Sequence, residues 1–350
     1  MKILVVSNMY PSPKYPSYGV FVANFCAQLE DLGVGYRLCA MKKHPSRLGK
    51  ALGYLAFYLS SFFLSLFGTW DAVYIHYASH SSPGVLLARK LKQFTVYTNV
   101  HGSDVMPENA KQEKFQYFTR RILALSQKII VPSAYFARCV GEKYGICPEK
   151  LHVCPSGGVD VNNFYPRKTV SNPVFTFGTV GRISHGKGWD TLLQACAAMP
   201  DRNYRLIIAG DGPERGAMED MLRTLHLEEN VHLLGTVSHS QLPEIYSSLD
   251  VFVFPTRRDG ESLGLVAVEA MACGTPVIAS DYAAPADYVR PGFNGEKFPV
   301  GDGLALRDAL VSFRALPEET RKRLSQGALA TAASYSRTAA TTRLKEILNA

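Results

Sequence analysis

The stretch VFVFPTRRDGESLGLVAVEAMACGTPVIAS, Val251 to Ser280, decides the fold more than any other. Its first four residues form an apolar run that predicts a buried strand, and PVIA, residues 276–279, predicts another. The apolar run between them, which ends at Ala272, predicts a helix, because Gly274 supplies a C-terminal stop and a proline follows. Strand, helix and strand in this order are typical of a parallel sheet covered by helices.

The same alternation continues through the chain in two series. The strands predicted for the first series are Ile3–Val6, Tyr36–Ala40, Ala72–His76, Thr95–Val100, Lys128–Val131 and Leu151–Cys154. Those predicted for the second series are Val174–Val180, Tyr204–Ala209, Val231–Leu234, Val251–Phe254, Pro276–Ala279 and Gly295–Phe298. Helical patterns separate most of them, as in Val20–Leu32, Ala110–Leu125 and Glu214–Leu225. We therefore expect an α/β protein with two doubly wound, Rossmann-like domains, and a ligand site in the cleft between them at the carboxyl ends of the strands.

Length and composition agree with two globular domains. The chain has 350 residues, of which 47% are hydrophobic and 19% charged. The segment Pro155–Pro173 is rich in Gly, Pro and Asn and predicts a linker. We expect an N-terminal domain of residues 1–166, a C-terminal domain of residues 167–335 and a last helix in residues 336–350.

The net charge of +8 is unevenly distributed. Residues 1–166 carry 18 Lys and Arg against 9 Asp and Glu, whereas residues 167–350 carry 20 against 21. A basic domain favours an anionic partner, which could be a membrane surface or a phosphate-bearing substrate. Nucleic acid is not expected, because the chain has no RNP-like, zinc-finger or helix-turn-helix signature.

The cysteines and the first residues indicate the cytoplasm. The cysteines number seven, and no two are spaced as CxxC, which predicts reduced thiols and no zinc site. The opening MKILVVSNMYPSP has too short an apolar run for a secretory signal. It fits a first strand that leads into a Pro-rich loop.

GRISHGKG, Gly181 to Gly188, nearly matches a P-loop between a strand and a helix. Gly188 stands where a P-loop has the hydroxyl that binds Mg²⁺, so nucleotide hydrolysis is not expected. Arg182 and Lys187 nevertheless place two cations at a strand–helix turn, which suits a phosphate. The alternative is an ordinary solvated loop.

A second glycine motif, GDGPERG at Gly210 to Gly216, also follows a predicted strand. It resembles a dinucleotide fingerprint with one residue too many and a proline in the turn, so a dehydrogenase is not expected. Gly210 could still let a ligand approach the backbone closely.

Two glutamates, Glu261 and Glu269, stand in or beside the apolar run of the opening stretch. A pair at this spacing is common by chance, so its context decides. Glu261 is expected in the loop before the helix and Glu269 about two turns along it. A buried unpaired carboxylate costs several kcal/mol, so Glu269 needs a partner. Sugar or ribose hydroxyls would satisfy it, and so would a core arginine.

The start of the same helix suits a phosphate. Free N–H groups at residues 262–265 would point along the helix dipole at an anion, and Gly264 would leave room for it. Carboxylates for hydroxyls beside amides for phosphate are what a nucleotide-sugar site requires.

Taken with its flanks, the chain resembles the retaining glycosyltransferases of family 4. ESLGLVAVEAMACGTPVIAS, preceded by FVFPT, is similar to the E–x7–E signature of that family. Four more segments resemble family elements in the same order: SYGVFVANFCAQLEDLGV, NVHGSDV, CPSGGVDVNNFYP and GTVGRISHGKGWDTLLQA, the last followed by IIAGDGPE. The resemblance implies a GT-B fold, with the acceptor on the N-terminal domain and the nucleotide sugar on the C-terminal domain.

By this resemblance Glu269 holds the ribose hydroxyls and Glu261 the donor sugar. Arg182 and Lys187 neutralise the diphosphate leaving group, and Leu265 donates an amide to it. No metal is implied, because two cations already do a metal's work and no D–x–D triplet occurs in the sequence. No cofactor is implied, since the nucleotide sugar is a co-substrate.

In the N-terminal domain the resemblance gives roles to two residues. Gly19 lets the backbone approach the diphosphate, and His101 lies against the donor sugar near the reacting carbon. Without the resemblance, a histidine after an apolar strand is more often structural. Its neighbours Gly102 and Asp104, at a strand's carboxyl end, favour a functional role.

The chain departs from the family at three places. Tyr18 precedes Gly19 where a second glycine is frequent, and Ser156 stands where Asn is common. The segment from Ala333 lacks the frequent Phe-Ser-Trp. Its last helix, residues 336–350, is still expected to cross back to the first domain.

LGKALGYLAFYLSSFFLSLFG, Leu48 to Gly68, has no charge after Lys50. We expect one stripe of this helix to face the core, namely Leu48, Leu52, Leu55, Leu59, Phe62 and Leu66. A core helix and a helix lying in the membrane interface both fit, and a membrane span fits poorly because it would divide the first sheet. The upstream cations and the basic domain favour an anionic membrane surface, with residues 42–67 as the contact.

The expected activity is hexosyl transfer from a UDP- or GDP-sugar to a hydroxyl of a lipid-linked or saccharide acceptor. Retention of the α configuration follows from the resemblance. The expected location is the cytoplasmic face of the cytoplasmic membrane. Two alternatives remain: a nucleotide-sugar-binding protein without transfer activity, and a nucleotide-sugar epimerase on the same fold.

Overall fold

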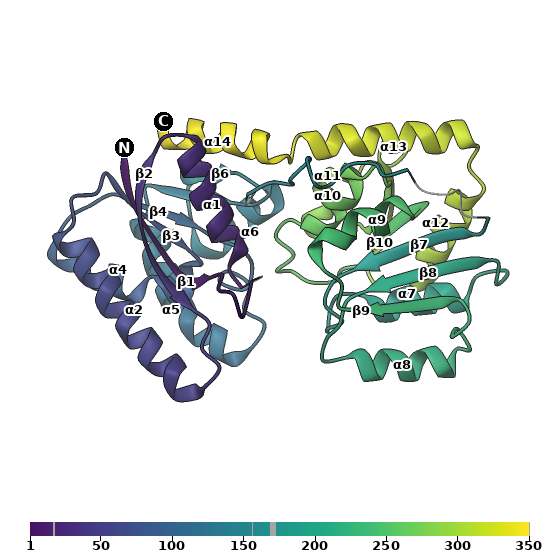
Figure 1. Cartoon of the computed structure of the whole chain (residues 1–350), viewed down its shortest axis with the longest axis horizontal. Coiled ribbons are helices and arrows are strands. Elements are labelled where there is room, and N and C mark those ends of the chain that lie inside the picture. Colours follow the sequence, from purple (N-terminus) through teal and green to yellow (C-terminus); the bar gives the residue numbers. More distant parts are fainter. Residues whose placement is uncertain (17, 156, 169–172, 350) are drawn as a thin grey trace. The chain divides into compact units, whose positions relative to one another are not determined.

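The computed structural model describes residues 1–16, 18–155, 157–168 and 173–349. The chain divides into two compact units, each with its own parallel sheet (Figure 1). The first unit contains Met1–Gly157 together with the chain from Ala340 onward, and the second contains Gly158–Ala339.

The sheet of the first unit has the strand order β2-β1-β3-β4-β5-β6, and all its pairs are parallel. Its strands are β1 (Lys2–Tyr10), β2 (Gly35–Lys42), β3 (Ala72–His76), β4 (Val96–Asn99), β5 (Lys128–Val131) and β6 (Leu151–Val153). Its helices are α1 (Val20–Asp31), α2 (Arg47–Phe67), α3 (Ala78–Ser81), α4 (Pro83–Leu91), α5 (Ala110–Leu125), α6 (Ala134–Tyr144) and the short η1 (Pro148–Lys150). The strand order reverses at β1, so the loops after β1 and β3 flank the switch point where such sheets bind ligands.

The second unit repeats this architecture with the strand order β12-β11-β10-β7-β8-β9. Its strands are β7 (Phe175–Val180), β8 (Tyr204–Ala209), β9 (Val231–Gly235), β10 (Val251–Phe254), β11 (Val277–Ser280) and β12 (Gly295–Phe298). Its helices are α7 (Trp189–Ala197), α8 (Arg215–Thr224), η2 (His239–Gln241), α9 (Leu242–Ser247), α10 (Leu265–Ala272), α11 (Pro285–Tyr288), α12 (Gly303–Arg314) and α13 (Glu318–Ala333). The switch point lies between β7 and β10.

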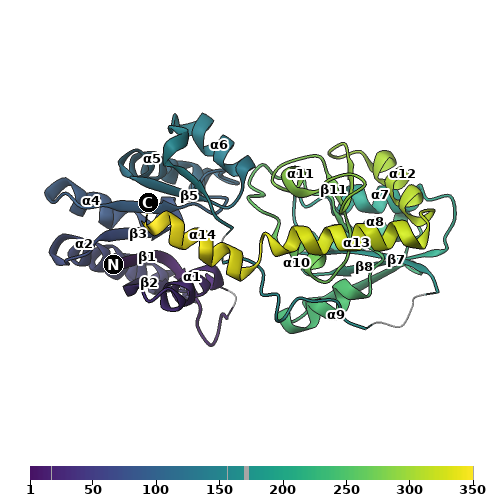
Figure 2. The ribbon, with the colours of Figure 1, turned by 90° about the horizontal axis from the view of Figure 1, so that it is seen from above.

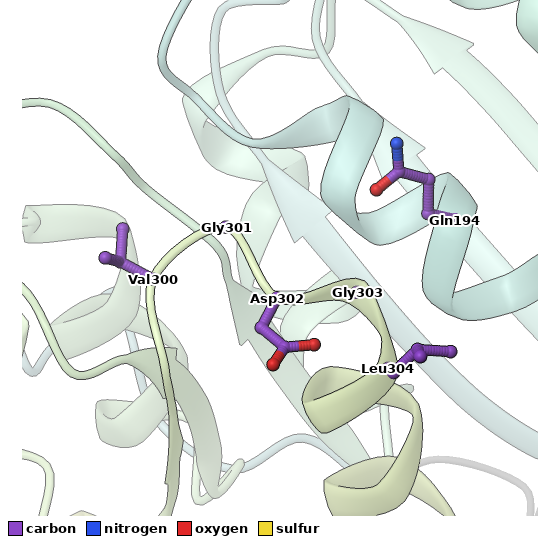
Figure 3. A pocket seen from close by; sticks show the side chains of 6 residues that line it. All are labelled: Gln194, Val300, Gly301, Asp302, Gly303 and Leu304. Atoms are coloured by element: carbon purple, nitrogen blue, oxygen red, sulfur yellow. The ribbon is translucent and has the colours of Figure 1, made fainter.

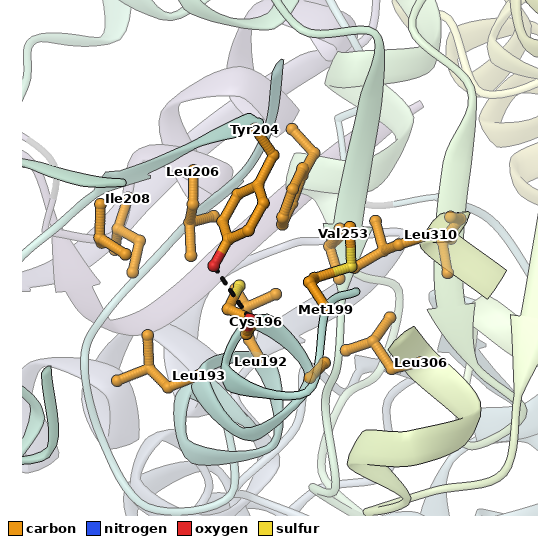
Figure 4. Packing of buried hydrophobic residues seen from close by; sticks show 14 of the residues in the cluster. Leu192, Leu193, Cys196, Met199, Tyr204, Leu206, Ile208, Val253, Leu306 and Leu310 are labelled. Carbon is orange, nitrogen blue, oxygen red and sulfur yellow. Dashed lines mark hydrogen bonds between the residues drawn. The ribbon is translucent and has the colours of Figure 1, made fainter. Parts of the chain in front are cut away.

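Each sheet is buried on both faces, which explains why its strands are apolar throughout. In the second unit, β7 and β8 pack against α7 and α12 (Figure 4). The Tyr204 hydroxyl, deep in this core, donates to the Cys196 carbonyl at 2.9 Å. The bond satisfies a polar group that burial would otherwise leave costly.

The prediction of twelve strands in two doubly wound sheets is confirmed. The predicted boundary at residue 166 is wrong, since contacts divide the chain after Gly157. Two observations explain the difference: the Val159 N–H donates to the Tyr335 carbonyl at 2.8 Å, and Phe164 is buried in the second unit's core. Ser156 and residues 169–172 of the predicted linker lie outside the described residues.

The last helix, α14 (Arg337–Asn349), starts close to the predicted residue 336. From Ala340 its residues belong to the first unit, where the helix lies beside α1 (Figure 2). Leu344 and Ile347 share a buried hydrophobic cluster with Phe25 of α1. The Gln28 side chain also donates to the Thr341 hydroxyl at 3.0 Å. These contacts are those expected of a helix that returns to the first domain.

The face of α2 predicted to pack in the core is the wrong one. Leu48, Leu52, Leu55 and Leu59 are all exposed, and the buried residues of the helix are Phe57, Ser61 and Ser65. Both sides of this helix are apolar, so hydrophobicity alone could not choose between them. Close packing decides, because small residues let helices approach: a side chain at Gly84 of α4 would collide with Ser61.

Candidate active site

Glu269 is buried in α10, with 4% of its surface exposed. One carboxylate oxygen accepts from the buried Tyr246 hydroxyl at 3.1 Å, and the other lies 3.3 Å from Nε2 of His239. The partners of Glu269 are therefore a tyrosine and a histidine, and not the core arginine considered as an alternative. The bond to Glu269 raises the pKa of His239, whereas burial, and then Glu269, raises that of Tyr246 well above its ordinary value.

The two partners of Glu269 differ in their exposure to solvent. The Tyr246 side chain is fixed in the core, while the His239 side chain is 66% exposed. A ligand hydroxyl can therefore replace His239 at the carboxylate without disturbing the core. Sequence reasoning missed both residues, and the available signal was that His239 closely follows strand β9, at its carboxyl end.

Glu261 lies in the loop before α10, as predicted, and forms an ion pair with Lys187. Their Nζ and Oε2 atoms are 2.6 Å apart, and both side chains are mostly buried. The pair joins the loop after β10 to the loop after β7. Arg182 and Lys187 line one small cavity of about 20 Å³, together with Phe254 at the end of β10. The structure thus brings three of the predicted site residues to one sheet edge.

Helix α10 begins at Leu265, with Gly264 as its N-cap, rather than at residue 262. Glu269 consequently lies about one turn into the helix instead of two. The backbone of Gly264 is left-handed, with a φ of 74°, and a side chain there would lie 2.7 Å from the Phe254 ring. Backbone conformation and packing therefore require glycine at this position, whatever binds beside it.

Gly210 follows β8 and touches the loop that carries Arg182. A side chain at Gly210 would collide with the carbonyl oxygen of Gly181, and the Gly181 N–H donates to Ala209 at 2.9 Å. The predicted close approach at Gly210 is thus made by another loop of the protein. It holds the turn before Arg182 in place.

In the first unit, Gly19 caps α1 directly beside the end of β1. A side chain there would lie 2.7 Å from the backbone of Met9, so only glycine lets the helix start so close to the strand. The site role predicted for Gly19 stays a prediction. Its position beside the switch point is the one that role requires.

His101 follows β4 and is held by the turn HGSD. The buried Asp104 carboxylate accepts from the N–H groups of His101, Gly102 and Ala78, at 2.9–3.0 Å. Asp104 therefore shapes the turn. Nε2 of His101 lies 3.1 Å from Nδ1 of His76, a contact that sequence reasoning missed although His76 ends the neighbouring strand β3.

Burial keeps both histidines neutral. It lowers the pKa of His101 to about 3 and that of His76 well below its ordinary value, with His101 as a further cause for His76. In the unfolded chain each histidine binds a proton near pH 6.5, whereas in the folded unit His101 binds one only near pH 3. Their stabilisation is thus complete above about pH 6.5 and falls with pH.

We expect the first unit to lose about 2 kcal/mol of unfolding free energy from His101 alone between pH 7.5 and pH 5. Denaturant unfolding at both pH values, followed by Trp70 fluorescence in a Trp189→Phe background, measures the loss. His101→Gln should reduce this loss, whereas the exposed His232→Gln should leave it unchanged. An equal loss in all three proteins would contradict the assignment.

A cavity of about 420 Å³ elsewhere in the second unit touches none of the predicted site residues (Figure 3). Its lining includes Gln194 and the turn from Val300 to Leu304. Its one charged side chain, Asp302, accepts from the Ala305 N–H at 2.9 Å and so caps α12. This carboxylate has a structural role.

The two parallel six-stranded sheets, with candidate site residues at the carboxyl ends of their strands, define the GT-B class. The chain matches the family described as Glycosyltransferase Family 4 over residues 18–162, and the family described as Glycosyl transferases group 1 over residues 163–330. It belongs to the glycosyltransferases built from these two domains, so the predicted resemblance is confirmed at that level.

Individual proteins agree with this assignment. The chain is 27% identical over 288 residues to a D-inositol 3-phosphate glycosyltransferase of Xylanimonas cellulosilytica, which covers 75% of this chain and 68% of the relative. Sucrose-phosphate synthase from Thermosynechococcus elongatus matches with a TM-score of 0.82 and 20% identity, over 99% of this chain and 98% of that one. Anabaena Alr3699/HepE in complex with UDP and glucose matches with a TM-score of 0.76 and 18% identity, over 100% of both chains.

Proposed function

We propose that this glycosyltransferase moves a hexosyl group from a UDP- or GDP-sugar to a hydroxyl of a lipid-linked or saccharide acceptor. The observation that carries the proposal is the Glu261–Lys187 ion pair beside the start of α10, one turn from the buried Glu269. In a nucleotide sugar the diphosphate lies between the ribose and the sugar. A cation suits the diphosphate, and the two carboxylates suit the hydroxyls on either side of it. Alr3699/HepE, which shares the fold, binds UDP and glucose, and the relative above is named for a phosphate-bearing acceptor.

In the proposed donor complex Glu269 accepts bonds from the ribose hydroxyls and His239 gives way. Lys187 leaves its ion pair with Glu261 and pairs with the diphosphate. Glu261 then accepts a hydrogen bond from a hydroxyl of the donor sugar. In the ion pair described above, Lys187 and Glu261 satisfy each other's charge. The exposed Arg182 adds a second cation for the diphosphate.

Backbone groups complete the proposed donor site. The N–H of Leu265, at the start of α10, points along the helix dipole and donates to the diphosphate. Gly264 and Gly210 fix the loops on which these groups lie. Gly19 and His101 belong to the first unit, and we propose that they meet the diphosphate and the sugar when the donor is bound.

The proposed reaction retains the configuration of the donor. The bond between the anomeric carbon and the diphosphate oxygen breaks, and the electron pair leaves with the nucleoside diphosphate. The acceptor hydroxyl forms the new bond on the same face, and its proton passes to the leaving phosphate. Lys187 and Arg182 stabilise the charge that develops there, so we propose that no metal is needed.

Product analysis separates this proposal from its alternatives. The chain is incubated with UDP-glucose or GDP-mannose, with and without a polyprenyl-phosphate sugar as acceptor, and released nucleotide and sugar isomers are measured. A transferase releases UDP or GDP faster when acceptor is present. Donor binding without release would favour a binding protein, and isomerised donor without acceptor would favour an epimerase.

We further propose that the reaction takes place at the cytoplasmic face of the cytoplasmic membrane. The support is the basic first domain and the apolar helix α2 within residues 42–67, which suit an acceptor anchored in anionic lipid. In the described part of the chain α2 is the one helix long and apolar enough to cross a membrane, by length and composition alone.

A further inference from the structure

Helix α2 turns its most apolar side toward solvent. Its outer stripe consists of Leu48, Leu52, Leu55, Leu59, Phe63 and Phe67, each at least half exposed. These residues recur every three or four positions and so lie on one side of the helix, over a length of about 28 Å. Contiguous apolar surfaces of this size are rare on soluble proteins and mark sites of interaction.

Helix α4 extends this apolar surface. Gly84 meets Ser61 of α2, so that side of α4 faces α2. Leu87 and Leu91, which are 51% and 67% exposed, lie next to the contact on the solvent side. Further round the helix, at 100° per residue, Leu86 and Lys90 face a groove. The apolar surface thus continues from the outer stripe, across α4, into that groove.

The α4–α5 groove has a volume of about 760 Å³ and combines apolar walls with cations. The apolar side chains include Leu86, Leu87, Phe118 and Leu125, and the cations are Arg89, Lys90 and Arg121. No carboxylate among the described residues forms a salt bridge with these three cations. The Nε atom of Arg89 is buried, and it has no hydrogen-bond partner among the described residues.

The chain that forms the outer stripe and the α4 side of the groove is almost wholly basic. Between Lys42 and Phe94 the chain carries seven Lys and Arg residues and a single acid, Asp71. Asp71 is occupied, because it accepts from the backbone N–H of Lys2 at 2.6 Å. An apolar surface bordered mainly by cations is complementary to a layer of anionic headgroups over hydrocarbon.

We propose that the outer stripe and the α4–α5 groove form one docking face for an anionic lipid bilayer. Helix α2 lies in the plane of the interface, and the groove seats one phospholipid. Its acyl chain lies along Leu86, Leu87 and Phe118, and its phosphate meets Arg89, Lys90 and Arg121. The inference deepens the membrane location proposed above and rests on it, but it holds whether or not the chain transfers a sugar.

Two other arrangements fit the observations less well. A second copy on this face would bring the same seven cations of each chain together across a two-fold interface. A membrane span by α2 would remove Phe57, Ser61 and Ser65 from the core of the first unit. An interfacial helix keeps this inner side packed and places only the outer stripe in lipid.

Vesicle flotation with the full-length chain tests the outer stripe. We expect binding to vesicles of phosphatidylcholine and phosphatidylglycerol at low salt, and little binding to phosphatidylcholine alone. Leu55→Glu with Leu59→Glu should lower the partition coefficient at least 10-fold, because two leucines that would lie in the lipid are lost. Leu304→Glu, at a comparably exposed leucine of α12, is the matched control and should bind as the wild type does.

Calorimetry with dihexanoyl-phosphatidylglycerol below its critical micelle concentration tests the groove separately. We expect one lipid per chain. Lys90→Gln with Arg121→Gln should weaken binding about 30-fold, at roughly 1 kcal/mol per cation near an anionic surface. The outer-stripe variant should still bind this lipid, since its groove is intact. Circular dichroism and the Tm verify that each variant is folded.

Several outcomes would overturn the inference. Absence of wild-type binding to anionic vesicles at low salt would remove the docking face. Equal lipid binding by the wild type and the groove variant would remove the seated phospholipid. A concentration-dependent dimer that the outer-stripe variant abolishes, without vesicle binding, would assign the face to a second copy. None of these readouts uses a sugar donor, so failure of the proposed function leaves them unaffected.

Discussion

Glu261→Gln is expected to lower kcat for sugar transfer by about 10²–10³-fold, because it removes a charged acceptor that is proposed to act at the donor sugar. The substitution keeps the shape of the side chain and removes its charge. It also frees Lys187 from its 2.6 Å ion pair, so no carboxylate competes with the diphosphate for this cation. UDP should therefore bind as tightly as to the wild type, or more tightly, while turnover is lost.

The matched control is Glu219→Gln, which removes a glutamate from the ion pair with Arg215 on the same unit. This pair is partly exposed and screened by solvent, so its loss should leave turnover within about twofold and the Tm nearly unchanged. Steady-state kinetics with saturating acceptor, together with UDP titration, give both quantities. Unchanged kcat in Glu261→Gln would remove its proposed role at the sugar.

Glu269→Gln is expected to weaken UDP binding by about 10–100-fold. The carboxylate is proposed to accept from the ribose hydroxyls, and a hydrogen bond to a charged group contributes about 1.5–3 kcal/mol. The glutamine keeps an acceptor for the Tyr246 hydroxyl, so the core should remain satisfied. The effect should therefore fall on the ligand and not on folding.

A ligand that lacks the ribose hydroxyls makes this test specific. Wild-type protein should prefer UDP to 2′,3′-dideoxy-UDP, and Glu269→Gln should lose most of that preference. His239→Gln is the comparison variant, because His239 also contacts Glu269 but is expected to leave when the ribose enters. Equal discrimination by wild type and Glu269→Gln would show that the ribose lies elsewhere.

The fold was largely predictable because its signals are local. Each strand is a short apolar run between turn residues, and burial on both faces makes these runs uniform. The loop position of Glu261 followed in the same way from the strand and helix around it. Local patterns also carried the resemblance to family 4, which the comparisons bear out as two glycosyltransferase domains, Family 4 for the first and group 1 for the second.

What the sequence did not reveal depends on contacts between distant residues. Glu261 and Lys187 are 74 positions apart, and Glu269 meets Tyr246 and His239 across 23 and 30 positions. Pairing of this kind follows from the sheet order, which the strands alone do not specify. The same holds for α2: its inner side is set by Gly84 of another helix, and hydrophobic periodicity alone selected the opposite side.

The most direct measurement for the central claim is a crystal structure of the protein with a bound UDP-sugar. The account predicts ribose hydroxyls within hydrogen-bond distance of Glu269, with Lys187 moved from Glu261 to the diphosphate. A nucleotide bound away from α10, with the Glu261–Lys187 pair and the His239 contact to Glu269 both intact, would contradict it.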